Sequence, residues 1–356
     1  MGIFYSAKKK LKAISKAHFY FEHDKAFNQK AQLAASSILK TLPNHALSAS
    51  SHKMIESYAL EKLGSLRFAP GLKAYSIYQG EFKEGWIPDN YFWRYVLPKA
   101  NGFHKPLSDL RQFAKRILQT EDMPDLGYFM KGTWTTVDNR VLSHQAAKDF
   151  FFSQFPEIII KLNSTMRGQG FFRLNPRQFD QFDFQNSRDF VVQAPIDQAD
   201  WYDQFTQESV ATLRITTLKL PGQAAHYRAA FMRFGQKGAD RITADSRLVV
   251  GVNPTGEMDR FALNSDWELS DRHPDSKISW EGMKIPDFEF MVKKCLELHE
   301  RVGSIEIIGW DVVMDKSDQM QLMEWNTDYP GIVHSEMTTG PNFLGLGWEN
   351  LWKSKA

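Results

Sequence analysis

The sequence contains almost no cysteine and no long apolar run. Cys295 is the only cysteine among the 356 residues, so an internal disulfide cannot form. No apolar stretch approaches the roughly 18 residues of a membrane-spanning helix, and the N-terminus lacks the apolar core and cleavage site of a secretory signal. We therefore expect a protein of a reducing, cytoplasmic compartment.

A strong net charge is absent as well. The chain holds 44 Lys and Arg against 42 Asp and Glu, a balance that does not favour a dedicated nucleic-acid binder. Residues 1–50 differ, because they contain eight lysines and only two acidic residues, Glu22 and Asp24. This basic arm is either a solvated helix face or a segment that contacts an anionic membrane or another acidic surface.

The overall composition is that of a globular protein. Hydrophobic residues make up 42% and charged residues 24% of the chain, which excludes wholesale disorder and predicts two or three domains. Residues 1 to about 75 have the spacing of helices, whereas short apolar strands follow from about residue 125. Pro286 begins the clearest helix, and Cys295 lies on its apolar stripe, so we interpret this cysteine as a core thiol.

Two apolar segments, 305–314 and 320–325, predict a late β-hairpin. A four-residue loop at 315–318 would pair Met314 with Gln319 and place Asp311 opposite Leu322. Alternation along the strands then puts three oxygen-bearing side chains on one face: Asp311, Glu324 and Asn326.

Two neighbouring carboxylates repel each other unless a cation or a cationic side chain lies among them. Carboxylate and amide oxygens favour Mg²⁺ or Mn²⁺ over zinc, so the predicted face is a candidate magnesium site. The alternative is a solvent-facing hairpin with ordinary surface charges. The apolar residues on both sides of Asp311 and Glu324 argue against that alternative, because they predict a hairpin buried on both faces.

A second candidate feature is the lysine that ends the apolar run 157–161. Lys161 would lose solvation there, which is costly unless an anion lies nearby. The loop 163–170 follows, with glycines that allow close approach of the backbone and with donors suited to phosphate. It is neither a Walker loop nor a dinucleotide-binding GxGxxG turn, and a polar hairpin turn with an unrelated lysine is the alternative.

Taken in order, these features resemble the ATP-grasp superfamily, and more closely the sugar-transfer-associated ATP-grasp family. The segments that carry the resemblance are 158–172, 191–218 and 309–331, within a similar region from about residue 86 to 345. The resemblance implies an α+β ATP-grasp fold, with two α+β subdomains gripping ATP behind a mainly helical N-terminal region. The implied division is 1–104 for the helical region, 105–194 for the lid-bearing subdomain and 195–356 for the catalytic subdomain.

The resemblance also implies a role for each matching residue. ATP phosphates would be contacted by Lys161, Arg167, Gly168 and Gly170, and the adenine-binding hinge would be Gln193, Ala194 and Ile196. Magnesium, or manganese in its place, would be held by Asp311, Glu324 and Asn326. The γ-phosphate or an acyl phosphate would face Arg214, with Arg233 as a second candidate; a strand-edge salt bridge is the alternative for both arginines.

The chain departs from the family pattern at several places: the hinge acid is Gln193, the spacing from Asn326 to Pro330-Gly331 is one residue longer than usual, and two cations are missing. Related ligases carry an arginine two residues before the first metal-binding aspartate, where this chain has Gly309, so we expect Arg214 to supply that charge. The lysine that usually precedes the lid is missing, and Arg111 or Lys115 could replace it.

The activity that the resemblance implies is an ATP-dependent carboxylate–amine ligase working through an acyl phosphate. Its substrates would be a small-molecule carboxylate and an amine, such as a sugar acid and an amino acid of polysaccharide biosynthesis. The alternatives are a kinase that phosphorylates a hydroxyl group and a catalytically silent nucleotide-binding module.

Overall fold

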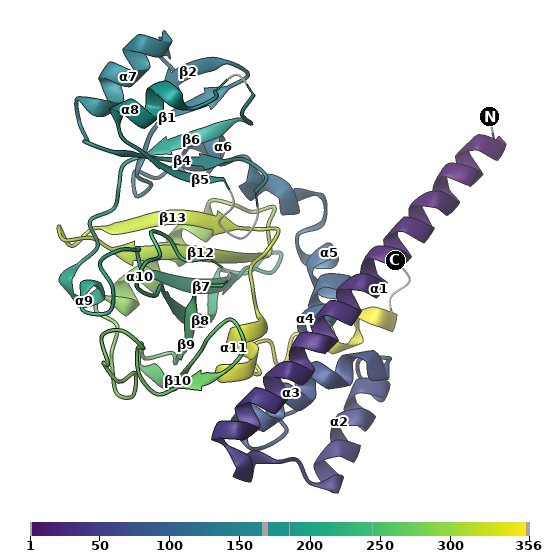
Figure 1. Ribbon diagram of the computed structural model, residues 1–356. Helices are drawn as coiled ribbons and strands as arrows, with labels where there is room; N and C mark the ends of the chain where they lie inside the picture. The colour runs from purple at the N-terminus through teal and green to yellow at the C-terminus, as the bar shows by residue number, and fades with distance from the viewer. Residues whose placement is uncertain (1, 166–169, 185, 244, 354–356) are drawn as a thin grey trace. The chain divides into compact units, whose positions relative to one another are not determined.

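The computed structural model describes residues 2–353 apart from 166–169, 185 and 244 (Figure 1). It divides into two compact units. Unit 1 comprises residues 1–99, 266–269 and 332–356, and unit 2 comprises 100–265 and 270–331. The predicted boundaries after residues 104 and 194 stay a prediction, but the contacts group residues 332–356 with the N-terminal helices rather than with the strands before them.

Unit 1 is helical, as predicted for its N-terminal residues. Its helices are α1 (Gly2–Thr41), α2 (Ala49–Glu61), α3 (Ala69–Gln79), α4 (Asp89–Tyr91), a π-helical turn (Phe92–Val96), α5 (Leu97–Ala100) and α11 (Val333–Thr338), with 3-10 turns at Pro43–His45, Leu66–Phe68 and Trp348–Lys353. The Ser48 hydroxyl accepts the N–H of Ser51 and begins α2, and Gly80 ends α3 in the left-handed conformation. None of the helices in the described part of the chain is long and apolar enough to cross a bilayer.

Unit 1 contains two buried carboxyl groups, and one of them, Glu336, connects α11 to the rest of the unit. Glu336 accepts backbone N–H groups from Ile87 at 2.9 Å and from Asn342 at 2.8 Å, while the Trp86 indole donates to the Glu336 carbonyl. Asp89 is buried at the start of α4. Burial raises the pKa of Glu336 and of Asp89 to about 7 in each case.

These two groups make the stability of the protein depend on pH. An unfolded aspartate titrates near pH 4, so between about pH 4 and 7 only the folded state holds the Asp89 proton, and stability falls as pH rises through this window. Asp89→Asn is therefore expected to raise the free energy of unfolding at pH 8 by about 2 kcal/mol. It should also reduce the slope of the free energy of unfolding against pH between pH 5 and 8. Urea unfolding between pH 5 and 8 measures this, with exposed Glu81→Gln as control; an unchanged slope in Asp89→Asn would contradict it.

The first sheet of unit 2 is antiparallel, with the strand order β3-β2-β1-β6-β4-β5. Its strands are β1 (Asp125–Met130), β2 (Thr133–Thr136), β3 (Val141–Leu142), β4 (Ile158–Leu162), β5 (Phe171–Leu174) and β6 (Phe190–Gln193). Helices α7 (His144–Phe152) and α8 (Pro176–Gln181) cover one face, and their aromatic residues form a core with Phe129, Ile160 and Val192. Helix α6 (Arg111–Leu118) contacts β1 and β6.

The second sheet has the order β11-β10-β9-β8-β7-β12-β13. Its strands are β7 (Thr212–Leu218), β8 (His226–Phe234), β9 (Leu248–Val252), β10 (Met258–Leu263), β11 (Leu269–Ser270), β12 (Ile307–Met314) and β13 (Met320–Asn326). The short helix α9 (Asp200–Asp203) precedes β7, and α10 (Phe288–Glu300) precedes β12. Cys295 of α10 is completely buried in the core beneath this sheet, so the prediction of a core position is confirmed. The predicted α+β class with a helical N-terminal region is also confirmed.

The predicted hairpin is present, but its predicted register is wrong. Met314 pairs with Met320 rather than Gln319, so the loop has one more residue than expected. A bulge at Met323 adds a second shift, and Asp311 therefore pairs with Glu324 rather than with Leu322.

The two shifts together leave the side-chain faces unchanged. Successive side chains of a strand alternate between faces, so one shift would have turned Glu324 away from Asp311, whereas two shifts return it. All of β12 is buried, which excludes the alternative of a solvent-facing hairpin.

Candidate functional site

Four neighbouring strands of the second sheet place polar side chains on one face. Arg214 of β7 lies directly opposite Asp311 of β12, which in turn lies opposite Glu324 of β13. Arg233 of β8 pairs with the residue two before Arg214, and therefore shares its face. The residues between them, such as Trp310, point into the core on the other side. The sheet register thus gathers the predicted arginines and metal-binding residues into one cluster.

Asp311 is the centre of this cluster. Arg214 binds it with two hydrogen bonds, Nε to Oδ1 at 2.5 Å and Nη2 to Oδ2 at 2.8 Å, and Arg233 Nη2 lies 2.5 Å from Oδ1. Burial by itself would raise the pKa of Asp311, but the two arginines outweigh that effect and hold the pKa well below its usual range. Asp311 is therefore a carboxylate at neutral pH.

Gly309 provides the space for the Arg214 guanidinium. A Cβ at Gly309 would lie 3.0 Å from Arg214 Nη1 and 2.6 Å from the Pro330 carbonyl. Arg214 Nη1 also donates to the carbonyls of Pro330 at 2.7 Å and Tyr329 at 3.2 Å. The Arg214 guanidinium, which comes from β7, thus lies beside Gly309 of β12. Gly309 is the position at which the family pattern in the sequence analysis has an arginine.

This close approach gives a test of the site. Gly309→Ala is expected to lower the free energy of unfolding by about 1–3 kcal/mol and to reduce activity, because the methyl group displaces Arg214 or the Pro330 carbonyl. Gly303→Ala is the control, since a Cβ at Gly303 would meet nothing within 4 Å. Urea unfolding and turnover measure both variants, and equal stability of the two would contradict the packing argument.

The first sheet contributes Lys161 and Gln193. Lys161 pairs with Val191, and Ile159 pairs with Gln193, so both polar side chains lie on the face opposite the aromatic core. Lys161 Nζ donates to the Met323 carbonyl at 3.2 Å; burial lowers the pKa of Lys161, an effect that the Glu324 carboxylate partly offsets. The lysine predicted from its apolar strand thus lies beside β13.

Gln193 is buried and anchored at the end of β6. Its Nε2 donates to Asp125 Oδ1 at 2.8 Å, and burial raises the pKa of Asp125. The N–H of the next residue, Ala194, donates to the Pro124 carbonyl at 2.8 Å, whereas Ile196 packs against the core of the second sheet. The adenine-binding role of this segment stays a prediction.

Arg111 is a site residue that the sequence indicated only as one of two candidates. Its Nη1 donates to Glu324 Oε2 at 2.7 Å, and its Nε donates to the Leu162 carbonyl at 3.3 Å. Burial and Asp311 would raise the pKa of Glu324, but Arg111 and Lys161 outweigh them and lower it. The other candidate, Lys115, forms an ion pair with the exposed Glu121.

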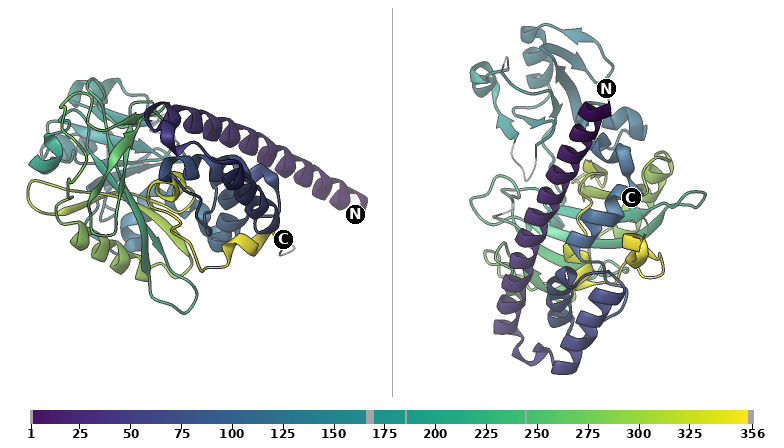
Figure 2. Two further views of the ribbon diagram at one scale, coloured as in Figure 1. Left: turned by 90° about the horizontal axis from the view of Figure 1, so that it is seen from below. Right: turned by 90° about the vertical axis from the view of Figure 1, so that its right-hand side faces the viewer.

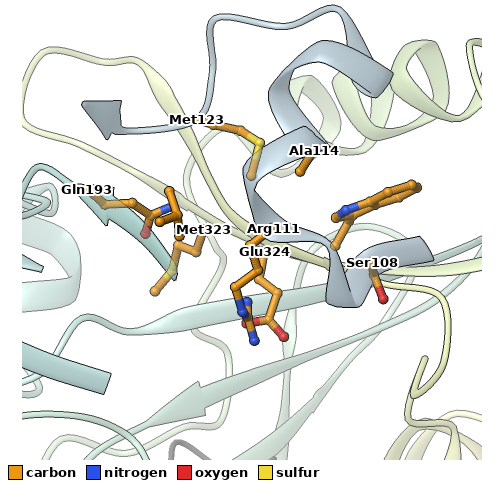
Figure 3. A pocket seen from close by; sticks show the side chains of 9 residues that line it. Ser108, Arg111, Ala114, Met123, Gln193, Met323 and Glu324 are labelled. Carbon is orange, nitrogen blue, oxygen red and sulfur yellow. The ribbon is translucent and has the colours of Figure 1, made fainter. Parts of the chain in front are cut away.

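These side chains border a small pocket between α6 and the two sheets (Figure 3). Its lining residues are Ser108, Arg111, Ala114, Met123, Val191, Gln193, Met323, Glu324 and Trp325. Arg111 and Glu324 lie together in the close-up, and Met323 lies beside Gln193. The pocket therefore has a charged end at Arg111 and Glu324 and an apolar wall that includes Met323, with the Gln193 amide beside that wall.

The donor chemistry of the predicted metal site fits a hard cation. Among the described residues, no three His, Cys, Asp or Glu side chains are arranged to hold a metal ion. The Asn326 amide N–H₂ approaches Asp311 Oδ2 at 3.5 Å and donates to the Gly309 carbonyl at 3.3 Å, so Asn326 does lie beside the two carboxylates. An amide oxygen and two carboxylates are ligands that Mg²⁺ accepts, although arginines engage both carboxylates here. Metal binding by the three residues stays a prediction.

Two predicted phosphate-binding residues, Arg167 and Gly168, lie outside the described residues. Gly170, the next described residue after them, has a φ of +84°, and a Cβ there would lie 2.8 Å from the Thr165 side chain. Glycine is thus required at this position by the turn itself.

The family comparison agrees with this geometry. Residues 180–347 match the family described as sugar-transfer associated ATP-grasp. This part of the chain is thus similar to the sugar-transfer associated ATP-grasp family. The predicted resemblance and the predicted ATP-grasp fold are therefore confirmed, over a region that begins later than the residue 86 expected from the sequence. The match covers Gln193, Arg214, Arg233 and the metal-site candidates, but not Lys161.

Several solved ATP-grasp structures are similar to this chain at low sequence identity. The ATP-grasp ligase PsnB has 11% identity and a TM-score of 0.40, covering 71% of this chain and 63% of its own. The VanG D-Ala:D-Ser ligase from Enterococcus faecalis has 10% identity and a TM-score of 0.41, covering 70% and 60%. The L-amino acid ligase from Bacillus licheniformis has 15% identity and a TM-score of 0.41, covering 70% and 49%. This chain thus spans less than two thirds of each, and no curated protein matches it.

Proposed function

We propose that the protein is an ATP-dependent carboxylate–amine ligase. The observation that carries the proposal is the excess of positive charge at the site: the four cations Arg111, Lys161, Arg214 and Arg233 surround the two carboxylates Asp311 and Glu324. These six groups sum to +2 in partly desolvated surroundings, and burial raises the pKa of the neighbouring carboxyl groups of Asp109 and Asp125, which opposes their ionisation. A positive excess of this kind is unfavourable without a polyanion. A nucleotide triphosphate supplies that anion.

The pocket supports the placement of the nucleotide. The apolar side chains of Val191, Met123 and Met323 provide flat contacts for a heterocycle, and Gln193 provides a polar group at the edge. Phosphates would then reach Lys161 and Arg111 at the charged end. Arginine and lysine side chains near a transferring phosphoryl group lower its barrier by stabilising the charge that develops there.

Magnesium would be held by Glu324 and Asn326, with Asp311 as third ligand, and would neutralise charge on the phosphates.

The two arginines beside Asp311 differ in how firmly they are held. Arg214 is fixed by Asp311 and by two backbone carbonyls, so its guanidinium is preorganised. Among the described residues, Arg233 has one ion-pair partner, Asp311, and its side chain is one-fifth exposed. Arg233 is therefore the arginine that can turn toward a substrate anion.

The proposed reaction balances as two displacements. A substrate carboxylate oxygen attacks the γ-phosphorus of ATP, and ADP leaves, which gives an acyl phosphate. The amine nitrogen then attacks the acyl carbon, phosphate leaves, and the nitrogen loses a proton to give the amide. The family description, sugar-transfer associated, supports a sugar acid or a related carboxylate as one substrate and an amino acid or amine as the other, in the cytoplasm where ATP is supplied.

The test is to incubate the purified protein with ATP, Mg²⁺ and pairs drawn from sugar acids and amino acids. ADP and phosphate should be released only with a matched pair, and mass spectrometry should show the mass of the amide. A stable phosphate ester on one substrate would show a kinase instead. ATP binding in a calorimeter without turnover on any pair would show a nucleotide-binding module, and ADP release without any acceptor would contradict ligase chemistry.

A further inference from the structure

The N-terminal half of α1 has few packing partners within unit 1. The helix is continuous from Gly2 to Thr41, and it extends past α2 and α3, which lie along its C-terminal half (Figures 1 and 2). Asp24 is the first buried residue of the described side chains, and it is fixed by Arg94 at 2.5 Å and Arg67 at 3.3 Å. Before it, Phe19 is 55% and Phe21 is 62% exposed. About twenty residues of helical backbone thus precede the first buried side chain that the structure describes.

The sequence of this helical segment separates apolar and basic positions. With 3.6 residues per turn, one arc of about 100° contains positions Phe4, Ala7, Leu11, Ile14 and Phe21. A separate arc of similar width contains positions Lys8, Lys9, Lys12 and Lys16, together with the aromatic positions Tyr5 and Phe19. The fifth lysine, Lys10, lies at the edge of the apolar arc, where a lysine can extend its long side chain toward lipid headgroups. A polar face rich in lysine beside a face of Phe, Leu and Ile is the pattern of helices that lie in a membrane interface.

The charge of the segment selects among possible partners. Residues 2–21 contain five lysines and no acidic residue. Two copies of such a helix would bring like charges together, which disfavours self-association. A nucleic acid would satisfy the lysines but would leave the apolar face in water. An anionic lipid surface satisfies both faces, because it offers phosphate headgroups above a hydrocarbon layer.

We propose that residues 2–21 of α1 bind the surface of an anionic membrane, with the helix lying parallel to that surface. The apolar face enters the boundary between headgroups and acyl chains, and the lysines contact lipid phosphates. The segment does not cross the bilayer, since no helix in the described part of the chain is apolar enough. This proposal is independent of the reaction proposed above, because it uses no residue of the ATP-grasp site.

Vesicle flotation of the full-length protein tests the proposal. The protein should float with vesicles rich in phosphatidylglycerol and remain in the dense fraction with pure phosphatidylcholine vesicles, and high salt should reduce the floating fraction. Leu11→Glu places a charge on the apolar face and is expected to weaken binding at least about tenfold.

Leu33→Glu is the matched control, because Leu33 is 63% exposed on the packed half of the same helix. It should bind the vesicles as the unchanged protein does, and all three proteins should unfold at the same temperature. Equal flotation with both lipids, no flotation at all, or equal binding by Leu11→Glu would overturn the proposal. A dimer in light scattering that Leu11→Glu converts to a monomer would overturn it in favour of self-association.

Discussion

Replacing Lys161 by methionine is expected to lower kcat/KM for ATP by about 100-fold or more. The methionine preserves the apolar stem but removes the charge that lies beside β13 and Glu324. Because the lysine is desolvated in the absence of an anion, its loss should cost little folding stability and should act on nucleotide binding and turnover. Calorimetric ATP binding and ADP release measure the two effects separately.

Lys148→Met provides the control for this experiment. Lys148 forms an ion pair with Asp180 at 2.6 Å on the helices α7 and α8 that cover the other face of the same sheet. Its loss should leave both ATP binding and turnover unchanged and should alter stability by about 1 kcal/mol or less. Wild-type affinity for ATP in Lys161→Met would show that the phosphates bind elsewhere.

The second large effect is expected for Arg214. Arg214→Met leaves the buried Asp311 with Arg233 as its remaining ion-pair partner among the described residues, and should lower the free energy of unfolding by about 3 kcal/mol. Adding Asp311→Leu removes the buried carboxylate that has lost Arg214, so the double variant should regain part of that stability. Activity should stay lost in both variants, because the double variant has neither the arginine nor the carboxylate.

This comparison separates a structural ion pair from a catalytic one. The exposed pair Arg272 and Asp271, 3.0 Å apart in the same unit, is the control, and the corresponding Met and Leu changes should each cost less than about 1 kcal/mol without loss of activity. An active Arg214→Met/Asp311→Leu variant would show that the pair serves folding alone. Urea unfolding and ADP release with the matched substrates are the measurements.

The sequence was sufficient to predict the shared face of Asp311, Glu324 and Asn326, but not the register of the strands that carry them. Which face a side chain occupies depends only on whether the number of one-residue register shifts is odd or even. The apolar residues that alternate with the three polar ones must face the core, and this requires an even number. The loop length and the bulge at Met323 depend on local backbone geometry that has no distinct residue signal. The predicted common face of the three side chains is therefore correct although the predicted pairing of the strands is wrong.

The positions of the cations show a second limit. Lys161 could be predicted from its place at the end of an apolar run, because desolvation of a lysine requires an explanation. Arg111 lies on α6, 213 residues before the Glu324 that it binds, and only the packing of α6 on the sheets distinguishes it from Lys115. The need for glycine at position 309 likewise could not be predicted, because it depends on Arg214 lying on the neighbouring strand.

The division of the chain has a consequence for its synthesis. Unit 1 contains residues from both sides of unit 2, and the side chain of Glu336 binds the backbone at Ile87. On the ribosome, the strands of the second sheet emerge before α11 does, so unit 2 can complete its core while the N-terminal helices still lack α11 as a partner. The helices that leave the ribosome first therefore reach their final packing only after α11 has emerged.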